Sequence, residues 1–178
     1  MWKLALAIVG LAIVAALIMA SRQPDSFRVV RSISVHAPPA RAYALVSDFN
    51  EWKSWSPFEK MDPAMKRTIS APSSGVGATY EWAGNSKAGA GQMTITRTEP
   101  DSAIGVRLDF TKPIEGHNRV EFTFVPQGEE TLVTWSMDGP RPFVSRFMGL
   151  FFDMDQIIGG QFSEGLAQLK TLAERPST

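Results

Sequence analysis

Residues 104–137, IGVRLDFTKPIEGHNRVEFTFVPQGEETLVTWSM, alternate between apolar and polar positions over three successive segments. Such alternation is typical of strands with one face in water and one face in a core. Turn residues separate the segments, at Pro113 to Gly116 and at Gln127-Gly128. The sequence therefore predicts an antiparallel meander here, with a single dry face.

The same pattern extends toward the N-terminus. Residues 65–103 predict further strands, with Tyr80 and Trp82 on one face, and Phe27 to Val35 predicts a first strand. In that first strand Arg31 interrupts an otherwise apolar face. Between it and the meander, Pro38-Pro39 begins a short helix and residues 50–57 predict a helical turn. We expect about seven strands in all.

Toward the C-terminus the period changes from two to between three and four. The apolar positions are Ile158, Phe162, Leu166, Leu169 and Ala173, which predicts a long amphipathic helix running to about Arg175. Asp153, with Gln156 three positions later, is typical of a helix N-terminus. The predicted fold class is therefore α+β, with a curved antiparallel sheet wrapped on the C-terminal helix. A helix covers only a strip of a curved sheet, so we expect a gap where a small molecule could bind.

The N-terminal residues form a different kind of segment. Leu4 to Ala20 contains apolar residues and Gly10 only, long enough as a helix to nearly span a bilayer. We expect residues 1–21 to be a transmembrane anchor, 22–26 a linker, 27–175 the folded domain and 176–178 a tail. A cleaved signal peptide is the alternative. We expect the domain on the periplasmic or extracytoplasmic side, with the cytoplasmic face as the alternative.

Composition excludes several classes of function. Eighteen basic residues balance eighteen acidic ones, so no net field attracts nucleic acid. The absence of cysteine removes disulfides, thiolate metal sites and cysteine nucleophiles. His36 and His117 lack the spacing of metal ligands, and we interpret them as exposed or turn residues. We therefore expect no metal, no cofactor and no nucleic-acid partner, and we assign no catalytic residue.

Several short motifs resemble those of a known superfamily. They are Val35-His36-Ala37-Pro38-Pro39, Val46-Ser47-Asp48-Phe49, Trp52-x-x-Trp55-Ser56-Pro57, Gly75-Val76-Gly77-Ala78-x-Tyr80-x-Trp82-x-Gly84, Gly89-x-Gly91-x-Met93-x-Ile95-Thr96, Thr131-x-Val133-Thr134-Trp135, and Ile158-Gly159 with Gly165-Leu166-x-x-Leu169-Lys170. With them, residues 27–174 resemble the SRPBCC (START/Bet v 1-like) superfamily, specifically its polyketide cyclase/dehydrase-like branch. The resemblance implies a helix-grip fold with a cavity under the C-terminal helix. Members bind lipids, sterols, polyketides, hormones or cofactors, and some are enzymes.

The candidate ligand-binding residues are aromatic. They are Trp52, Trp55, Trp82, Phe110, Phe122, Phe124 and Trp135 in the domain, with Phe147 and Phe151 in the apolar segment near the last helix. For any single one of these residues, packing in an ordinary hydrophobic core explains its position at least as well as ligand binding does. The apolar residues of the segment 141–154 predict a lid over the cavity, the first turns of the last helix, or a surface that dips into a bilayer.

The leading hypothesis for function is a membrane-tethered protein that binds an apolar small molecule, such as a lipid or polyketide-like compound, in an internal cavity. One alternative is a cyclase- or hydrolase-type enzyme that uses polar groups in the same cavity. Another is an interaction module of an envelope complex. A carboxylate, histidine or tyrosine pair inside the cavity would favour the enzyme.

Overall fold

The computed structural model describes residues 2–150 and 153–176, without the side chains of Leu4, Ala5, Ala7, Ala12 and Met154. In chain order the elements are α1 (Trp2–Ser21), β1 (Ser26–Val35), α2 (Pro39–Ser47), α3 (Trp52–Trp55), the 3₁₀ helix η1 (Pro57–Lys60), β2 (Lys66–Ile69), β3 (Thr79–Ala83), β4 (Ala90–Glu99), β5 (Ala103–Lys112), β6 (Gly116–Gln127), β7 (Glu130–Pro140), α4 (Phe143–Met148) and α5 (Met154–Ala173).

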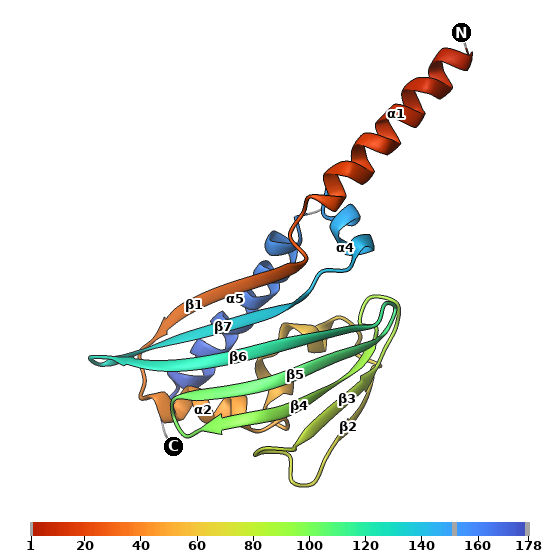
Figure 1. Ribbon diagram of the computed structural model, residues 1–178. Coiled ribbons are helices and arrows are strands. Elements are labelled where there is room, and N and C mark those ends of the chain that lie inside the picture. Colours follow the sequence, from red (N-terminus) through yellow and green to blue (C-terminus); the bar gives the residue numbers. More distant parts are fainter. Residues whose placement is uncertain (1, 151–152, 177–178) are drawn as a thin grey trace.

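The strands form one curved sheet, as the alternating sequence predicts (Figure 1). Its seven strands are ordered β1-β7-β6-β5-β4-β3-β2, and every neighbouring pair is antiparallel. The inward positions of the meander, such as Val106, Phe122 and Val133, are buried. The first strand joins the end of the meander, which places Arg31 opposite Trp135 in the ladder. His117, expected in a turn, lies in β6 instead.

Helix α5 covers the concave face of this sheet. Its buried residues Phe162, Leu166 and Leu169 are no more than 1% exposed, which confirms the predicted apolar stripe. The side chain of Asp153 accepts a hydrogen bond from the backbone N–H of Gln156 at 3.1 Å, which confirms the predicted start of the helix. The predicted α+β helix-grip architecture is therefore present: a seven-stranded antiparallel sheet closed by a C-terminal helix.

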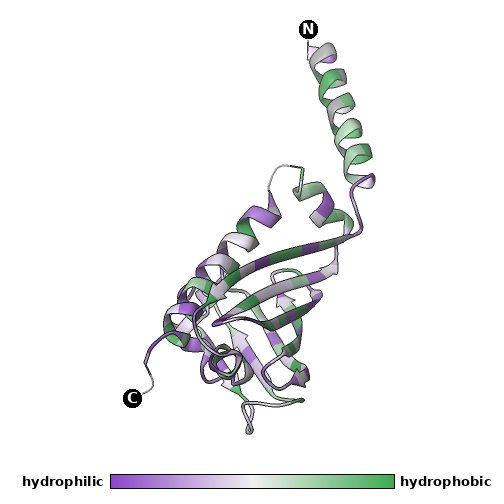
Figure 2. Ribbon diagram, turned by 90° about the vertical axis from the view of Figure 1, so that its left-hand side faces the viewer, coloured by the Kyte–Doolittle hydropathy of each residue, from purple (hydrophilic) through white to green (hydrophobic). Residues whose placement is uncertain are grey.

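Helix α1 projects away from the domain (Figure 1), and Figure 2 shows hydrophobic residues on nearly all of its turns. The prediction of a helix in this segment is confirmed. Its role as a membrane span is not shown, since among the residues that the structure describes no helix is both long and apolar enough to cross a bilayer. Helix α4 is separate from α5 and packs near the end of α1.

Candidate ligand site

An aromatic cluster fills the space beneath the middle of α5. The Trp135 and Phe162 rings are stacked, with centroids 4.0 Å apart and planes 8° apart. Phe122 lies 4.9 Å from Trp135, and Trp55 lies 5.6 Å from it, both measured between centroids. Trp52 contacts Trp55 at 4.9 Å and completes the group. The structure brings these four candidate residues together, and they pack against one another as a core, so their contact with a ligand stays a prediction.

The tryptophan N–H groups show what holds this cluster in place. Trp52 Nε1 donates to the Val46 carbonyl and Trp55 Nε1 to the Leu45 carbonyl, each at 2.9 Å. Carbonyls in the last turn of a helix have no partner inside the helix, so the two indoles cap the end of α2. Trp135 differs, because its Nε1 is buried and has no hydrogen-bond partner in the described part of the chain.

The remaining candidates are dispersed. Trp82 and Phe110 form an edge-to-face pair, 5.5 Å between centroids, on β3 and β5 at some distance along the sheet from the cluster. Phe124 packs edge-to-face with Tyr43 of α2 at 5.6 Å. Phe147 lies in α4, and Phe151 lies outside the described residues. Ligand contact by any of these residues stays a prediction.

A cavity of about 600 Å³ opens at the N-terminal end of α5. Its lining residues come from the start of β1, the end of β7, the α4 segment and the first turns of α5; they are Phe27, Arg28, Val29, Pro140, Arg141, Ser145, Gly149, Leu150, Asp153, Asp155 and Ile158. None of the candidate aromatic residues that the structure describes is among them. A neighbouring hollow of about 690 Å³ shares Phe27, Arg28 and Pro140 with this cavity, and its other lining residues, Ser26, Arg119, Asp138 and Gly139, are mostly polar. The first cavity is therefore the better apolar site.

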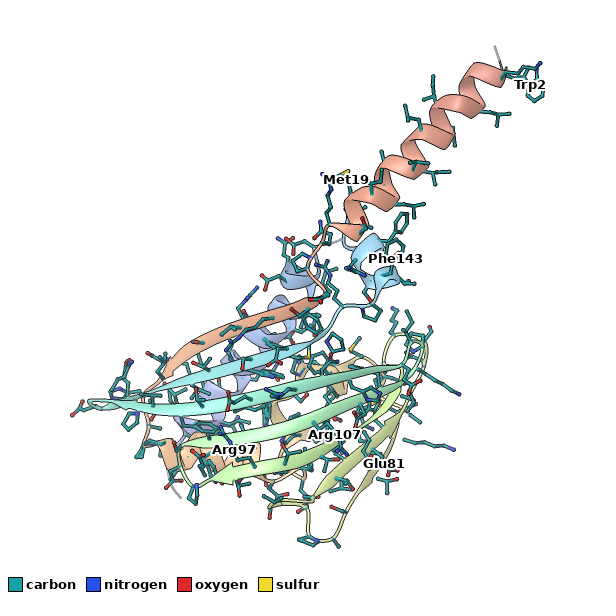
Figure 3. All side chains as sticks on the ribbon, viewed as in Figure 1. Trp2, Met19, Glu81, Arg97, Arg107 and Phe143 are labelled. Carbon is teal, nitrogen blue, oxygen red and sulfur yellow. The ribbon has the colours of Figure 1, made fainter. Side chains whose placement is uncertain are left out.

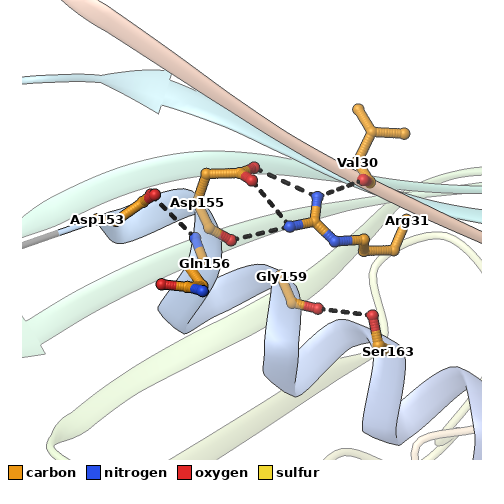
Figure 4. Close-up of polar contacts among 7 residues, drawn as sticks. All are labelled: Val30, Arg31, Asp153, Asp155, Gln156, Gly159 and Ser163. Atoms are coloured by element: carbon orange, nitrogen blue, oxygen red, sulfur yellow. Dashed lines mark hydrogen bonds and ion pairs between the residues drawn. The ribbon is translucent and has the colours of Figure 1, made fainter.

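A charged contact joins β1 to α5 at the edge of this cavity (Figure 4). Arg31 Nη2 donates to Asp155 Oδ2 at 2.8 Å and to the Asp155 carbonyl at 3.0 Å. Arg31 Nη1 donates to the Val30 carbonyl at 2.7 Å. Hydrogen bonding from Arg31 holds the pKa of the Asp155 carboxyl below its usual value, and the same bond raises the pKa of Arg31. The one signal in the sequence was Arg31 itself, which interrupts the apolar face of its strand.

A second polar cluster lies between η1 and β3. Glu59 accepts a hydrogen bond from Tyr80 Oη, and its other carboxylate oxygen lies 2.6 Å from Arg67 Nε. Burial, together with this hydrogen bond, raises the pKa of the Tyr80 hydroxyl. Both Glu59 oxygens are thus engaged, and none of the three residues lines the cavity described above. The cluster links η1 to the sheet through hydrogen bonds to β2 and β3. Sequence analysis missed it because no motif or periodicity in the sequence marks Glu59.

The described residues offer no cluster of three histidine, aspartate or glutamate side chains that could hold a metal ion. The exposed His117 forms a hydrogen bond through Nδ1 with Asp109 Oδ1 on β5, at a distance of 2.8 Å. His36 donates its backbone N–H to Glu174 at 2.7 Å. Both histidines therefore have local surface partners and neither faces the cavity. What the site offers chemically is an apolar wall with charged groups at its rim.

Comparisons with known proteins agree with this architecture. Residues 26–174 match the profile of a family described as polyketide cyclase/dehydrase and lipid transport. A comparison with curated protein sequences finds no match.

Solved structures share the fold at low sequence identity. A protein from Chromobacterium violaceum aligns with a TM-score of 0.60 and 16% identity, over 86% of this chain and 100% of its own. A protein from Mesorhizobium loti aligns with a TM-score of 0.61 and 16% identity, over 85% and 100%. Truncated norcoclaurine synthase from Thalictrum flavum aligns with a TM-score of 0.59 and 14% identity, over 88% and 99%. At these identities the likeness extends to the fold alone.

Proposed function

The chain belongs to the polyketide cyclase/dehydrase and lipid transport family, and from this premise we propose that it is a membrane-tethered protein that binds an apolar small molecule. The family description suggests a hydrophobic-ligand-binding domain. We assign the ligand to the cavity at the N-terminal end of α5, and its chemical class to lipids or polyketide-like compounds that carry a polar group.

The cavity is the observation that carries this proposal. Its volume of about 600 Å³ falls within the range of roughly 300–1,000 Å³ typical of small-molecule pockets. Phe27, Val29 and Ile158 give it apolar walls from two different elements. Each 100 Å² of a ligand's apolar surface buried there would contribute about 2.5 kcal/mol before the costs of association.

The charged rim supports an amphiphile over a pure hydrocarbon. Arg28 and Arg141 line the same cavity as Asp153 and Asp155. Charged side chains at a pocket's edge orient a ligand by its polar group while the apolar walls bind its body. An amphiphilic ligand satisfies both kinds of surface, whereas a hydrocarbon would leave the polar part of the lining in contact with apolar atoms.

Membrane attachment through α1 is the second part of the proposal. It is supported by the sequence of residues 4–20, which contains no charged or amide side chain. Large apolar side chains of α1, such as Leu6, Leu11 and Met19, are more than half exposed in the isolated chain. Exposure of such apolar side chains is energetically favourable in lipid and unfavourable in water. Lys3, before this segment, supports placing the domain on the extracytoplasmic side.

Photolabelling by a diazirine analogue of palmitic acid would test the ligand site. The full chain is reconstituted in phosphatidylcholine vesicles with this probe, irradiated and mapped by peptide mass spectrometry. We expect adducts on the peptides that contain Val29 and Leu150, because both residues line the cavity. Adducts on α1 report contact with bulk lipid and serve as an internal standard for each sample.

Two neighbouring isoleucines of α5 give a matched pair of variants. Ile158 lines the cavity, whereas Ile157 is 54% exposed. Ile158→Trp fills the cavity and should lower labelling of its lining by about tenfold or more, a difference of ~1.4 kcal/mol or more. Ile157→Trp should leave labelling unchanged. Equal labelling of the lining in both variants, or labelling confined to α1 in the unaltered protein, would contradict the proposal.

A further inference from the structure

Helix α4 presents apolar side chains to its surroundings. At 100° per residue, Phe143, Val144, Phe147 and Met148 fall on one side of the helix and Ser145 and Arg146 on the other. Phe143 is 41% exposed, Val144 60% and Met148 45%. Adjacent apolar side chains of this size on a short helix are an unfavourable surface in water and mark a contact with another apolar phase.

The chain holds α4 at the base of α1. Helix α1 ends at Ser21 and β1 begins at Ser26, so the connection is short. Backbone hydrogen bonds fix it: Gln23 N–H donates to the Ala20 carbonyl at 3.2 Å, and Arg141 N–H to the Asp25 carbonyl at 2.6 Å. Residues 22–25 can extend by no more than about 14 Å. Because α4 begins just after Arg141, it cannot lie far from the surface where α1 would leave a bilayer.

The views of the molecule agree with this placement. Figure 1 shows α4 next to the end of α1, and Figure 3 shows Met19 of α1 and Phe143 of α4 at the same end of the molecule. The exposed apolar surface of α1 therefore continues onto α4. Met19 is 59% exposed and Ile18 49% exposed at the end of α1. A single lipid phase could cover both helices.

The polar side of α4 suits a lipid headgroup region. The Arg146 guanidinium carbon lies over the Phe143 ring, 5.7 Å from its centroid, and Arg22 is exposed where α1 ends. Arginine can keep its apolar stem among lipid chains while its guanidinium reaches the phosphates. A short helix with apolar residues on one side and arginine on the other is the composition of helices that lie in a membrane interface.

From these observations we propose that α4 lies in the membrane interface beside α1, with its apolar side chains among the lipids. The inference rests on the attachment of α1 proposed above. Ser145 of α4 and the following Gly149 and Leu150 line the ligand cavity. The contact therefore places one wall of the cavity at the bilayer surface.

Site-specific fluorescence on the full chain tests this placement. The protein has no cysteine, so Val144→Cys, Leu11→Cys and Glu129→Cys can each carry one NBD label. All three side chains are exposed. Glu129 lies in the turn between β6 and β7, whereas α4 follows the other end of β7. The variants are reconstituted in vesicles of phosphatidylcholine and phosphatidylglycerol that contain doxyl-labelled lipid, with the quencher placed either near the headgroup or deep in the acyl chain.

The proposal predicts a different result at each position. The label at residue 144 should lose emission mainly to the shallow quencher, the label at residue 11 mainly to the deep one, and the label at residue 129 to neither. If residue 11 is quenched and residue 144 behaves like residue 129, α1 is attached but the inference about α4 is wrong. If residue 11 is also unquenched, the attachment itself fails and the inference fails with it. A blue-shifted but unquenched label at residue 144 would indicate a protein neighbour, such as a second copy, and would overturn the lipid contact.

Discussion

Asp155 joins the first turn of α5 to β1 at the edge of the cavity. Its carboxylate and its carbonyl both accept hydrogen bonds from Arg31, so a single guanidinium bridges the side chain and the backbone of the first turn of the helix. A carboxylate near a helix N-terminus is also favoured by the helix dipole. Both effects favour the ionised form, in agreement with the lowered pKa of Asp155.

The lowered pKa of Asp155 predicts a pH dependence of stability. A pKa that is lower in the folded than in the unfolded protein stabilises the fold above the ordinary value of 3.8, and this stabilisation is lost as the pH falls through the folded pKa. Asp155→Asn should therefore lower the melting temperature at about pH 7 but not at about pH 2. Thermal unfolding of the full chain in detergent micelles at both pH values measures this. A difference from the unaltered protein that persists unchanged at low pH would contradict the account.

Individual residues also show how far sequence reasoning reaches. Arg31 was visible as a charge on an apolar face, but its partner Asp155 is distant in sequence, so only the fold reveals the pair. The sequence predicts Trp52 and Trp55 near a pocket, which stays a prediction, but it does not reveal that their indole N–H groups cap α2. Alternation and helical period place a side chain on a face; they do not identify the carbonyl to which it donates.

At the scale of elements, α5 can approach β1 closely because Gly159 has no side chain. A methyl group at Gly159 would overlap with the Arg31 guanidinium, whereas one at Gly160 would meet no atom within 4 Å in the described structure. Arg31 therefore passes over the helix at a residue whose lack of a side chain leaves room for it. The contact between β1 and α5 depends on this pairing of a small residue with a long one.

The adjacent glycines predict opposite outcomes for the same substitution. Gly160→Ala should stabilise the protein by up to about 1 kcal/mol, because alanine is the better helix former. Gly159→Ala gains the same propensity but has to displace the Arg31 guanidinium, so it should be less stable than Gly160→Ala. Chemical denaturation of both variants measures the difference. Equal stabilisation by the two substitutions would show that Arg31 does not hold this contact.

The elements themselves follow from patterns that the sequence makes explicit. Residues 104–137 predict strands because a period of two admits no other regular structure with one dry face. The segment 141–154 is different, since apolar residues crowd it without a clear period. The sequence therefore leaves open whether this segment forms a lid, the start of the last helix or a membrane contact. The structure shows α4 as a helix separate from α5. The position of the cavity depends on that separation.

At the scale of the whole molecule, packing divides the interior beneath α5 into a filled and an open part. The stacked Trp135 and Phe162 occupy the middle, and the cavity lies toward α4, where α5 begins beside the paired ends of β1 and β7. Sequence patterns predicted the sheet, the helix and the existence of a gap between them. The place of the gap depends on the volumes of side chains far apart in sequence, such as Trp55 and Phe162, and so required the folded structure.

Native mass spectrometry of the full chain, purified from membranes in mild detergent, tests the central claim most directly. If the cavity holds an amphiphile, the unaltered protein and Ile157→Trp should both carry an additional mass that corresponds to one lipid-sized molecule. Ile158→Trp, with the cavity filled, should carry little or none of it. Absence of any bound molecule from the unaltered protein, or its full retention in Ile158→Trp, would contradict ligand binding at the N-terminal end of α5.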